Sequence, residues 1–431
     1  MFSYVRSGVQ KKKSTFGSHL ALAFALAGVT TLGLGVLEAP AHAAKKAKAG
    51  KSNYSKGFVA VYQPVAGKAN AEGADFASIK GELPSVMAAV QTEDDRFAAG
   101  QLAYNVGTKS KDSALQRQGM DMMLESGKVA PEQLGQFLFV AGQLAFQAKD
   151  YPAARDRIEK ALAAGYTDNG PEALIAESYI AEDNITAGLN YLSAAIAKYK
   201  AEGRPIPESW PKRGLAVAYK AGNGDEARRF AALLIQQDPS SDSWGDAVAI
   251  ERSFFNYDDQ ATLDLMRLAR RTGSMRNERD YVDYISAADA RRLPGEVTVV
   301  LQEGINGGKL NNGDVFVSEA MSVSKGRLAA DKADLPALAK DARSASSKAV
   351  TAMAAGDAFL SYGDAAQAEE MYTIALTKPC VDSDRALTRL GIAQVDLGKY
   401  DDAKATFAKV QGSRGQIAQL WALYANQEAG G

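Results

Sequence analysis

The sequence predicts an all-α fold, an α-solenoid built from short helix hairpins that stack side by side. The hexapeptide AGQLAY at 99–104 returns as AGQLAF at 141–146, about forty residues later. Apolar residues recur at helical spacing in short stretches that glycine turns separate. Near the C-terminus two such units follow one another at an offset of about 35 residues. One hairpin cannot bury both of its apolar stripes, so neighbouring hairpins have to stack.

Residues 1–43 have the pattern of a cleaved secretory signal. The start is basic at Arg6 and at residues 11–13, which are lysines, and residues 20–36 form a charge-free apolar run. Ala41 and Ala43 are small residues at the spacing that a signal peptidase accepts. An uncleaved anchor is the alternative, because about 17 residues is the lower limit for crossing a bilayer. Glycines and threonines within the run favour cleavage. We therefore expect cleavage after Ala43, no transmembrane anchor in the mature chain, and a periplasmic or otherwise exported protein.

Residues 44–80 are rich in lysine, alanine and glycine, and six lysines precede the first acid, Glu72. This composition predicts a flexible N-terminal segment. Its charge is compatible with weak contact to an anionic cell wall or membrane surface. The stretch FVAVYQPV at 58–65 is too apolar for a pure linker, so we expect it to dock on the helical stack or on a partner.

The solenoid itself is expected over residues 81–431. Its clearer repeats fall at 135–240 and 349–414, whereas 245–347 keeps the spacing but loses the motif. We expect degenerate hairpins in that part at 246–273, 277–307 and 315–346. Good N-cap residues stand where second helices should begin, namely Asp150, Asp183, Asn223 and Asp364. One last helix with an apolar stripe of Ile417, Leu420, Trp421 and Tyr424 should shield the end of the stack.

The unit LTRLGIAQVDLGKYDDAKATFAKVQG, which starts at Leu387, shows the repeat pattern best. Gly391 stands where the first helix approaches its partner, and Ala403 and Phe407 follow in the second helix. The preceding unit repeats this arrangement with Gly356, Ala368 and Tyr372. The pattern resembles the tetratricopeptide repeat (TPR) family, in an exported bacterial form. The resemblance implies a right-handed superhelix whose first helices line a concave groove for a peptide or a partner's helix.

Within each first helix, the residue just before the turn occupies the position that faces the groove in TPR proteins. In four consecutive units this residue is aromatic: Tyr104, Phe146, Tyr179 and Tyr219. We expect this aromatic ladder to hold an apolar or extended peptide, because each ring offers a large contact area at low entropy cost. Polar residues near the ladder that could assist binding are Gln101, Gln143, Lys212 and Lys220. Packing between repeats is the alternative use of the four rings.

Composition excludes several classes of function. The two histidines, His19 and His42, both lie in the leader, and Cys380 is the only cysteine. We therefore expect no catalytic residues, no cofactor and no metal site of the histidine or thiolate kind. A formal net charge of −1 gives no general attraction to nucleic acid. Five arginines between residues 267 and 279 are interspersed with acids, which predicts a solvated helix face.

Two hypotheses of different class remain. The first is an exported, non-enzymatic TPR scaffold that binds a protein or peptide of the cell envelope through its concave groove. The alternative is an α-solenoid module of a cell-wall, glycan-processing enzyme system, in which a pair of carboxylates would do the chemistry. A third possibility is a cytoplasmic adaptor whose first residues are not a signal.

Overall fold

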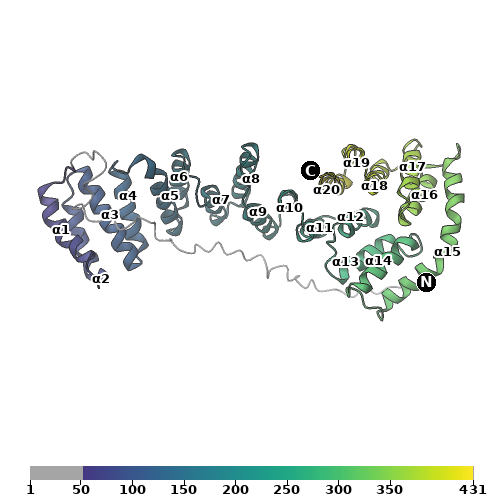
Figure 1. Ribbon diagram of the computed structural model, residues 1–431, viewed down its shortest axis with the longest axis horizontal. Helices are drawn as coiled ribbons and strands as arrows, with labels where there is room; N and C mark the ends of the chain where they lie inside the picture. Colours follow the sequence, from purple (N-terminus) through teal and green to yellow (C-terminus); the bar gives the residue numbers. More distant parts are fainter. Residues whose placement is uncertain (1–51, 431) are drawn as a thin grey trace. The chain divides into compact units, whose positions relative to one another are not determined.

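The computed structural model describes residues 52–430, and every regular element in that range is a helix (Figure 1). The expected leader lies outside the described residues. Contacts divide the chain into two compact units between Ala216 and Val217. Each unit is a series of helices in which sequence neighbours pack together, so the predicted all-α fold of TPR-like hairpins is confirmed. Within the described range, no helix combines the length and the apolar character needed to cross a membrane.

The first unit is built from eight helices and most of a ninth, and from α1 to α8 each helix contacts the next. Their bounds are α1 (Lys56–Ala69), α2 (Phe76–Ala88), α3 (Glu93–Ser110), α4 (Ser113–Glu125), α5 (Pro131–Gln147), α6 (Tyr151–Ala163), α7 (Pro171–Ala181), α8 (Ile185–Ala201) and α9 (Ser209–Lys220).

The N-terminal segment is helical where we expected flexible chain. Helices α1 and α2 occupy 56–69 and 76–88, and α1 begins at the N-cap Ser55. Phe58 is 1% exposed and Val65 is buried, and both belong to one apolar cluster with residues of α2 and α3. These two residues are seven apart and share one face of α1, so the lysines fall on its other faces. The expectation of a flexible segment over residues 44–80 is therefore wrong for α1 and α2.

Small residues allow the paired helices to approach closely. A Cβ on Gly142 of α5 would lie 2.5 Å from Ile158 Cγ1 of α6. A Cβ on Gly100 of α3 would lie 2.7 Å from a backbone oxygen of α4. The hexapeptide recurs because each copy places a glycine at the same close approach in its hairpin. In the second unit Gly356 meets the ring of Tyr372 in the same way.

Three of the four expected N-caps are confirmed. Asp150, Asn223 and Asp364 accept hydrogen bonds from the first turns of α6, α10 and α17. The fourth expectation was one residue early, since Asn184 caps α8. Asp183 has a φ of 64° and supplies the left-handed turn that precedes the cap.

The second unit contains the remaining helices, and their bounds are α10 (Gly224–Gln237), α11 (Ser241–Phe254), α12 (Asp259–Arg271), α13 (Glu278–Ala288), α14 (Pro294–Asn306), α15 (Val315–Arg343), α16 (Ala349–Ser361), α17 (Ala365–Leu376), α18 (Ser383–Asp396), α19 (Tyr400–Phe407) and α20 (Arg414–Glu428). Two of the degenerate hairpins are present as α11 with α12 and α13 with α14. The third is not: α15 is a single helix of 29 residues.

The reason for the long helix is local. A turn between two helices needs a residue whose backbone leaves the right-handed helical conformation. No residue between 315 and 343 has a positive φ. Gly326 stays helical, and Pro336 is accommodated inside the helix. The spacing of apolar residues predicted a hairpin here, but the segment lacks the residues that would form its turn.

The last helix, α20, covers the end of the stack as predicted, and it also contacts α12 (Figure 1). Trp421 is fully buried, and its Nε1–H donates to the backbone oxygen of Asp264 at 2.9 Å. Trp244 of α11 donates from Nε1 to Oε1 of Gln427 at 3.2 Å. The second unit therefore returns on itself, because its final helix packs on helices that lie some 150 residues earlier.

Candidate functional site

The interior of the second unit contains a network of buried charges centred on α12. Asp264 and Arg389 are both 0% exposed. Asp264 accepts hydrogen bonds from Arg267 Nη1 at 3.1 Å, Arg389 Nε at 3.1 Å and Arg414 Nη1 at 2.6 Å. These donors come from α12, α18 and α20, so one carboxylate connects three helices.

Asp357 of α16 is a second node of this network. Both of its oxygens accept from Arg389 Nη1 at 2.6 Å, and Arg385 Nη2 donates to Oδ2 at 2.7 Å. Tyr372 donates its hydroxyl to Oδ1 at 2.9 Å. Burial by itself would raise the pKa of Asp357, but the charges of Arg389 and Arg385 hold it below its ordinary value. Asp357 therefore stays ionised near neutral pH.

Glu296 in the first turn of α14 is the third node. Arg267 donates to its two oxygens from Nε at 2.7 Å and Nη2 at 2.6 Å, and Tyr284 donates its hydroxyl at 2.6 Å. Burial opposes ionisation, yet Arg267 lowers the pKa of Glu296 below its usual value. Because arginines hold Asp357 and Glu296 ionised, these two carboxylates stabilise the unit and are poorly suited to proton transfer.

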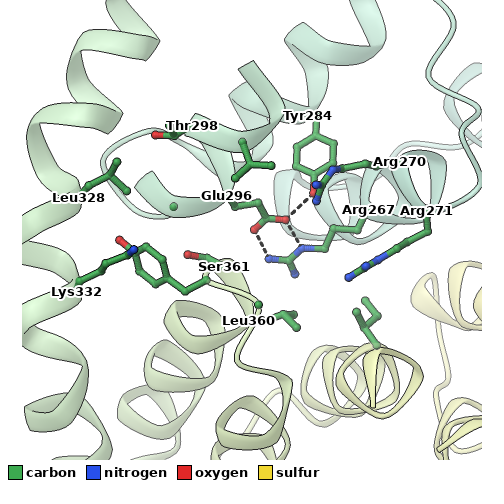
Figure 2. A pocket seen from close by; sticks show the side chains of 15 residues that line it. Arg267, Arg270, Arg271, Tyr284, Glu296, Thr298, Leu328, Lys332, Leu360 and Ser361 are labelled. Carbon is green, nitrogen blue, oxygen red and sulfur yellow. Dashed lines mark hydrogen bonds and ion pairs between the residues drawn. The ribbon is translucent and has the colours of Figure 1, made fainter. Parts of the chain in front are cut away.

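A cavity of about 470 Å³ lies beside the network in the second unit (Figure 2). Cations from two helices line it: Arg267, Arg270 and Arg271 of α12, and Lys332 of α15. Glu303 binds Arg270 through two bonds of 2.7 and 2.6 Å. Other lining residues form an apolar wall: Val299, Leu328, Leu360 and Ile392.

Asp396 pairs with Arg271 at 2.6 Å, and its pKa is shifted in the opposite direction from those of Asp357 and Glu296. Burial raises the pKa of Asp396, and Arg271 opposes that effect only in part. Within residues 52–430, no three His, Cys, Asp or Glu side chains are grouped so that they could hold a metal ion. The cavity is thus a binding-sized space with a mixed cationic and apolar lining.

One of the four aromatic residues of the predicted ladder is buried. Tyr104 is 4% exposed and lies in an apolar cluster with Met120, Met123 and Phe137. A partner cannot reach this ring, so for Tyr104 packing between helices is the correct interpretation. Its hydroxyl-bearing ring fills the space between two successive hairpins.

The other three rings are half-buried and each contacts a neighbouring ring. Phe146 meets Tyr151 edge-on at a centroid distance of 5.3 Å. Tyr179 lies 6.4 Å from Tyr191, and the Cζ of Arg155 lies 4.2 Å from its centroid. Tyr219 meets Phe254 edge-on at 5.4 Å. Part of each side chain remains accessible to a partner.

The polar residues proposed beside the ladder are found in different settings. Gln101 and Gln143 are half-buried, and Lys220 is exposed. Lys212 forms an ion pair with Glu208, which directly precedes α9. Tyr219 and Lys220 follow the division at Ala216 and belong to the second unit, whereas Phe146 and Tyr179 belong to the first. The ladder is therefore divided between the two units.

The arginine cluster is a solvated face only in part. Arg271 and Arg279 are exposed, whereas Arg267 is 5% exposed and Arg276 pairs with Asp246 at 2.9 Å. In α12 the buried residues include Asp264 and Arg267 beside Leu263, Leu265, Met266 and Leu268. A buried charge has to be paired, but the spacing of residues within one helix does not show which charges the rest of the unit covers. Sequence reasoning missed Asp264 and Arg389 for the same reason.

No protein-family model matches this chain, and no curated protein is similar to it in sequence. Among solved structures, the chain is similar to one described as "Crystal structure of APC/C hetero-tetramer Cut9-Hcn1". The identity is 15%, the match covers 80% of this chain and 71% of that chain, and the TM-score is 0.24. A TM-score of this size carries no argument about function, so the fold assignment rests on the helices and their contacts.

Proposed function

We propose that this chain is an exported, non-enzymatic TPR-like scaffold that binds a protein or peptide partner of the cell envelope. The observation that supports this proposal most directly is the equivalent placement of Phe146 and Tyr179. Each ends the first helix of its hairpin and keeps part of its ring accessible. Aromatic side chains at a regular interval on stacked hairpins suit an extended peptide or a partner's helix.

In vivo crosslinking through a photoreactive residue at position 179 tests this proposal. The matched control is the same residue at position 156, an exposed site on the second helix of the preceding hairpin. We expect position 179 to crosslink one envelope protein, identified by mass spectrometry, and position 156 to give no such product. Equal products at both positions, or none at 179, would contradict the proposed binding surface.

Export is tested separately by N-terminal sequencing of the protein from its native cells. A sequence that begins at Ala44 supports the exported scaffold, because it requires removal of residues 1–43 by a signal peptidase. A sequence that begins at Met1 in the cytoplasmic fraction would favour the adaptor hypothesis. Weak contact of the lysines before α1 with an anionic surface belongs to the same proposal.

The glycan-processing alternative receives less support from the geometry. Glycan cleavage needs one carboxyl group that stays protonated near neutral pH and a second carboxylate facing it. Asp396 has a raised pKa, but the nearby Glu296 is occupied by Arg267 and Tyr284. Release of muropeptides from purified cell wall by the purified protein would reverse this preference.

A further inference from the structure

The cavity of the second unit is lined by one cation that has no carboxylate partner among the described residues. Of the four cations that line it, Arg267, Arg270 and Arg271 each have a carboxylate within 2.7 Å. The fourth, Lys332, is exposed and forms no ion pair with any residue in the described range. Its Nζ lies 5.3 Å from the centroid of the Tyr362 ring. Among the described residues, Lys332 is therefore the lining cation with which a bound carboxylate could pair without displacing a carboxylate of the chain.

Two further features offer hydrogen-bond donors at the same place. Ser361 is 7% exposed, lines the cavity between Lys332 and Leu360, and has no partner for its hydroxyl (Figure 2). A buried hydroxyl without a partner is costly and uncommon. The N-terminus of α14 also lines the cavity through Gly295, and no side chain caps its first turn. Free N–H groups at a helix start favour an anion.

The cavity wall also presents apolar surface that a bound ligand would cover. Val299 remains 44% exposed in the cavity wall. Leu328 and Ile392 extend this apolar lining. The volume of about 470 Å³ falls in the range of small-molecule sites. A single charge combined with apolar lining selects an amphiphilic ligand over an inorganic ion.

We propose that this cavity binds an organic monoanion, a carboxylate group attached to an apolar body. The carboxylate lies between Lys332, the Ser361 hydroxyl and the start of α14, and the apolar body covers Val299 and Leu328. A monoanion matches the one uncompensated cation, whereas a dianion such as phosphate would bring a second charge next to Glu296. This inference goes beyond partner capture and does not depend on it.

Calorimetric titration of the full-length mature protein at low ionic strength tests the proposal. The probe is 4-phenylbutyrate, and its matched control is the uncharged 4-phenylbutyramide. We expect the dissociation constant of the acid to be at least tenfold lower than that of the amide, because hydrogen bonds to a charged group are stronger than hydrogen bonds to a neutral one. N-acetyl-Gly-Phe with a free or an amidated C-terminus distinguishes a peptide end from a free small acid as the source of the carboxylate.

Variants locate the site. Lys332→Met should weaken 4-phenylbutyrate binding about tenfold, and Ser361→Ala several-fold. Lys325→Met, an exposed change on the same helix and outside the cavity lining, should leave the affinity unchanged. Thermal melts show that each variant is folded. Absence of binding, equal binding of the acid and the amide, or equal losses in Lys325→Met and Lys332→Met would overturn the proposal. Crosslinking at position 179 would be unaffected by any of these outcomes.

Discussion

Arg389 illustrates how a buried charge is tolerated in this protein. Its guanidinium is surrounded by acceptors, with Asp264 and Asp357 at 3.1 and 2.6 Å and the Gln260 side chain at 3.0 Å. A buried charge is acceptable only when it is paired and its hydrogen-bonding groups are satisfied. Removal of the arginine would leave two buried carboxylates with fewer partners, which is more costly than loss of a surface pair.

We therefore expect Arg389→Met to lower the free energy of unfolding by about 3–5 kcal/mol. The matched control is Arg343→Met, because Arg343 also binds a carboxylate, Glu370, at 2.6 Å but both side chains are more than 40% exposed. The control should cost much less, because an ion pair between exposed side chains contributes little to stability. Urea denaturation followed by circular dichroism measures both. Equal losses in the two variants would show that burial of the network contributes nothing.

The close-approach glycines permit a second comparison at this scale. A Cβ on Gly391 would collide with the ring of Phe407, whereas a Cβ on Gly326 meets nothing within 4 Å. Both glycines are inside helices of the second unit. Gly391→Ala should thus destabilise by about 1–3 kcal/mol through overpacking. Gly326→Ala should stabilise by up to about 1 kcal/mol, because alanine is the better helix former. We expect the melting temperature to fall in Gly391→Ala and to rise in Gly326→Ala. A rise in Gly391→Ala would mean that the two helices of the hairpin can move apart at no cost in free energy.

At the scale of helices, α20 connects the end of the chain to α12. Its buried Trp421 stacks 6.3 Å from Phe407 of α19 and donates to the backbone of α12. Arg414 at the start of α20 binds Asp264 in the same helix α12. The terminal helix thus does more than shield one repeat, because it stabilises a helix that is distant in sequence.

Trp421→Ala should therefore increase hydrogen exchange in α12 as well as in α20, at a cost of about 3–5 kcal/mol. Trp210→Ala is the matched control, since Trp210 is equally buried but lies in the first unit, 4.8 Å from Tyr199. Exchange mass spectrometry resolves the two helices. Unchanged protection of α12 in Trp421→Ala would show that the contact between Trp421 and α12 does not stabilise α12.

Helix α15 shows what hydrophobic spacing cannot decide. Most of its central residues are exposed, and its buried side chains lie near its two ends, at Val317, Ala320, Ser324, Ala339 and Ala342. A helix that packs only at its ends leaves its middle free to line a cavity. Leu328 and Lys332 come from this middle part. The absence of a turn in residues 315–343 thereby creates the space that we infer to be a binding site.

For the whole molecule, the buried carboxylates predict how the stability of the fold depends on pH. The pKa values of Asp357 and Glu296 are lowered in the folded state from 3.8 and 4.5. A lowered pKa contributes stability above the unfolded value, and that stability is lost as the pH falls through the folded value. Both groups lie in the second unit. We expect the second unit to lose stability below about pH 4, and the first unit as well, because the pKa of its buried Asp95 is also lowered by hydrogen bonds.

Exchange mass spectrometry at pH 7 and near pH 3 measures the loss of protection in each unit, helix by helix. In Asp357→Asn, the loss of stability seen at neutral pH should shrink towards zero as the pH falls, because the wild-type carboxylate is then protonated too. A destabilisation that stays constant with pH would show that Asp357 acts through packing and not through its charge.

The sequence by itself determined the class of fold, the position of most hairpins and the contact points within them. Gly142, Gly356 and Gly391 lie at close approaches because local spacing and residue size decide how two adjacent helices pack. The same local information predicted the N-caps at Asp150 and Asn223. These features depend on residues that are near each other in the chain.

Only the tertiary structure decided which charges are buried and where a cavity forms. The pairs Arg389–Asp264 and Arg414–Asp264 join residues 125 and 150 positions apart. No local pattern specifies such pairs, because they depend on the second unit returning on itself. Burial of Tyr104 and the packing of α1 were likewise set by neighbouring helices. Periodicity fixes which face of a helix is apolar, but the partners of that face come from contacts that the whole chain makes.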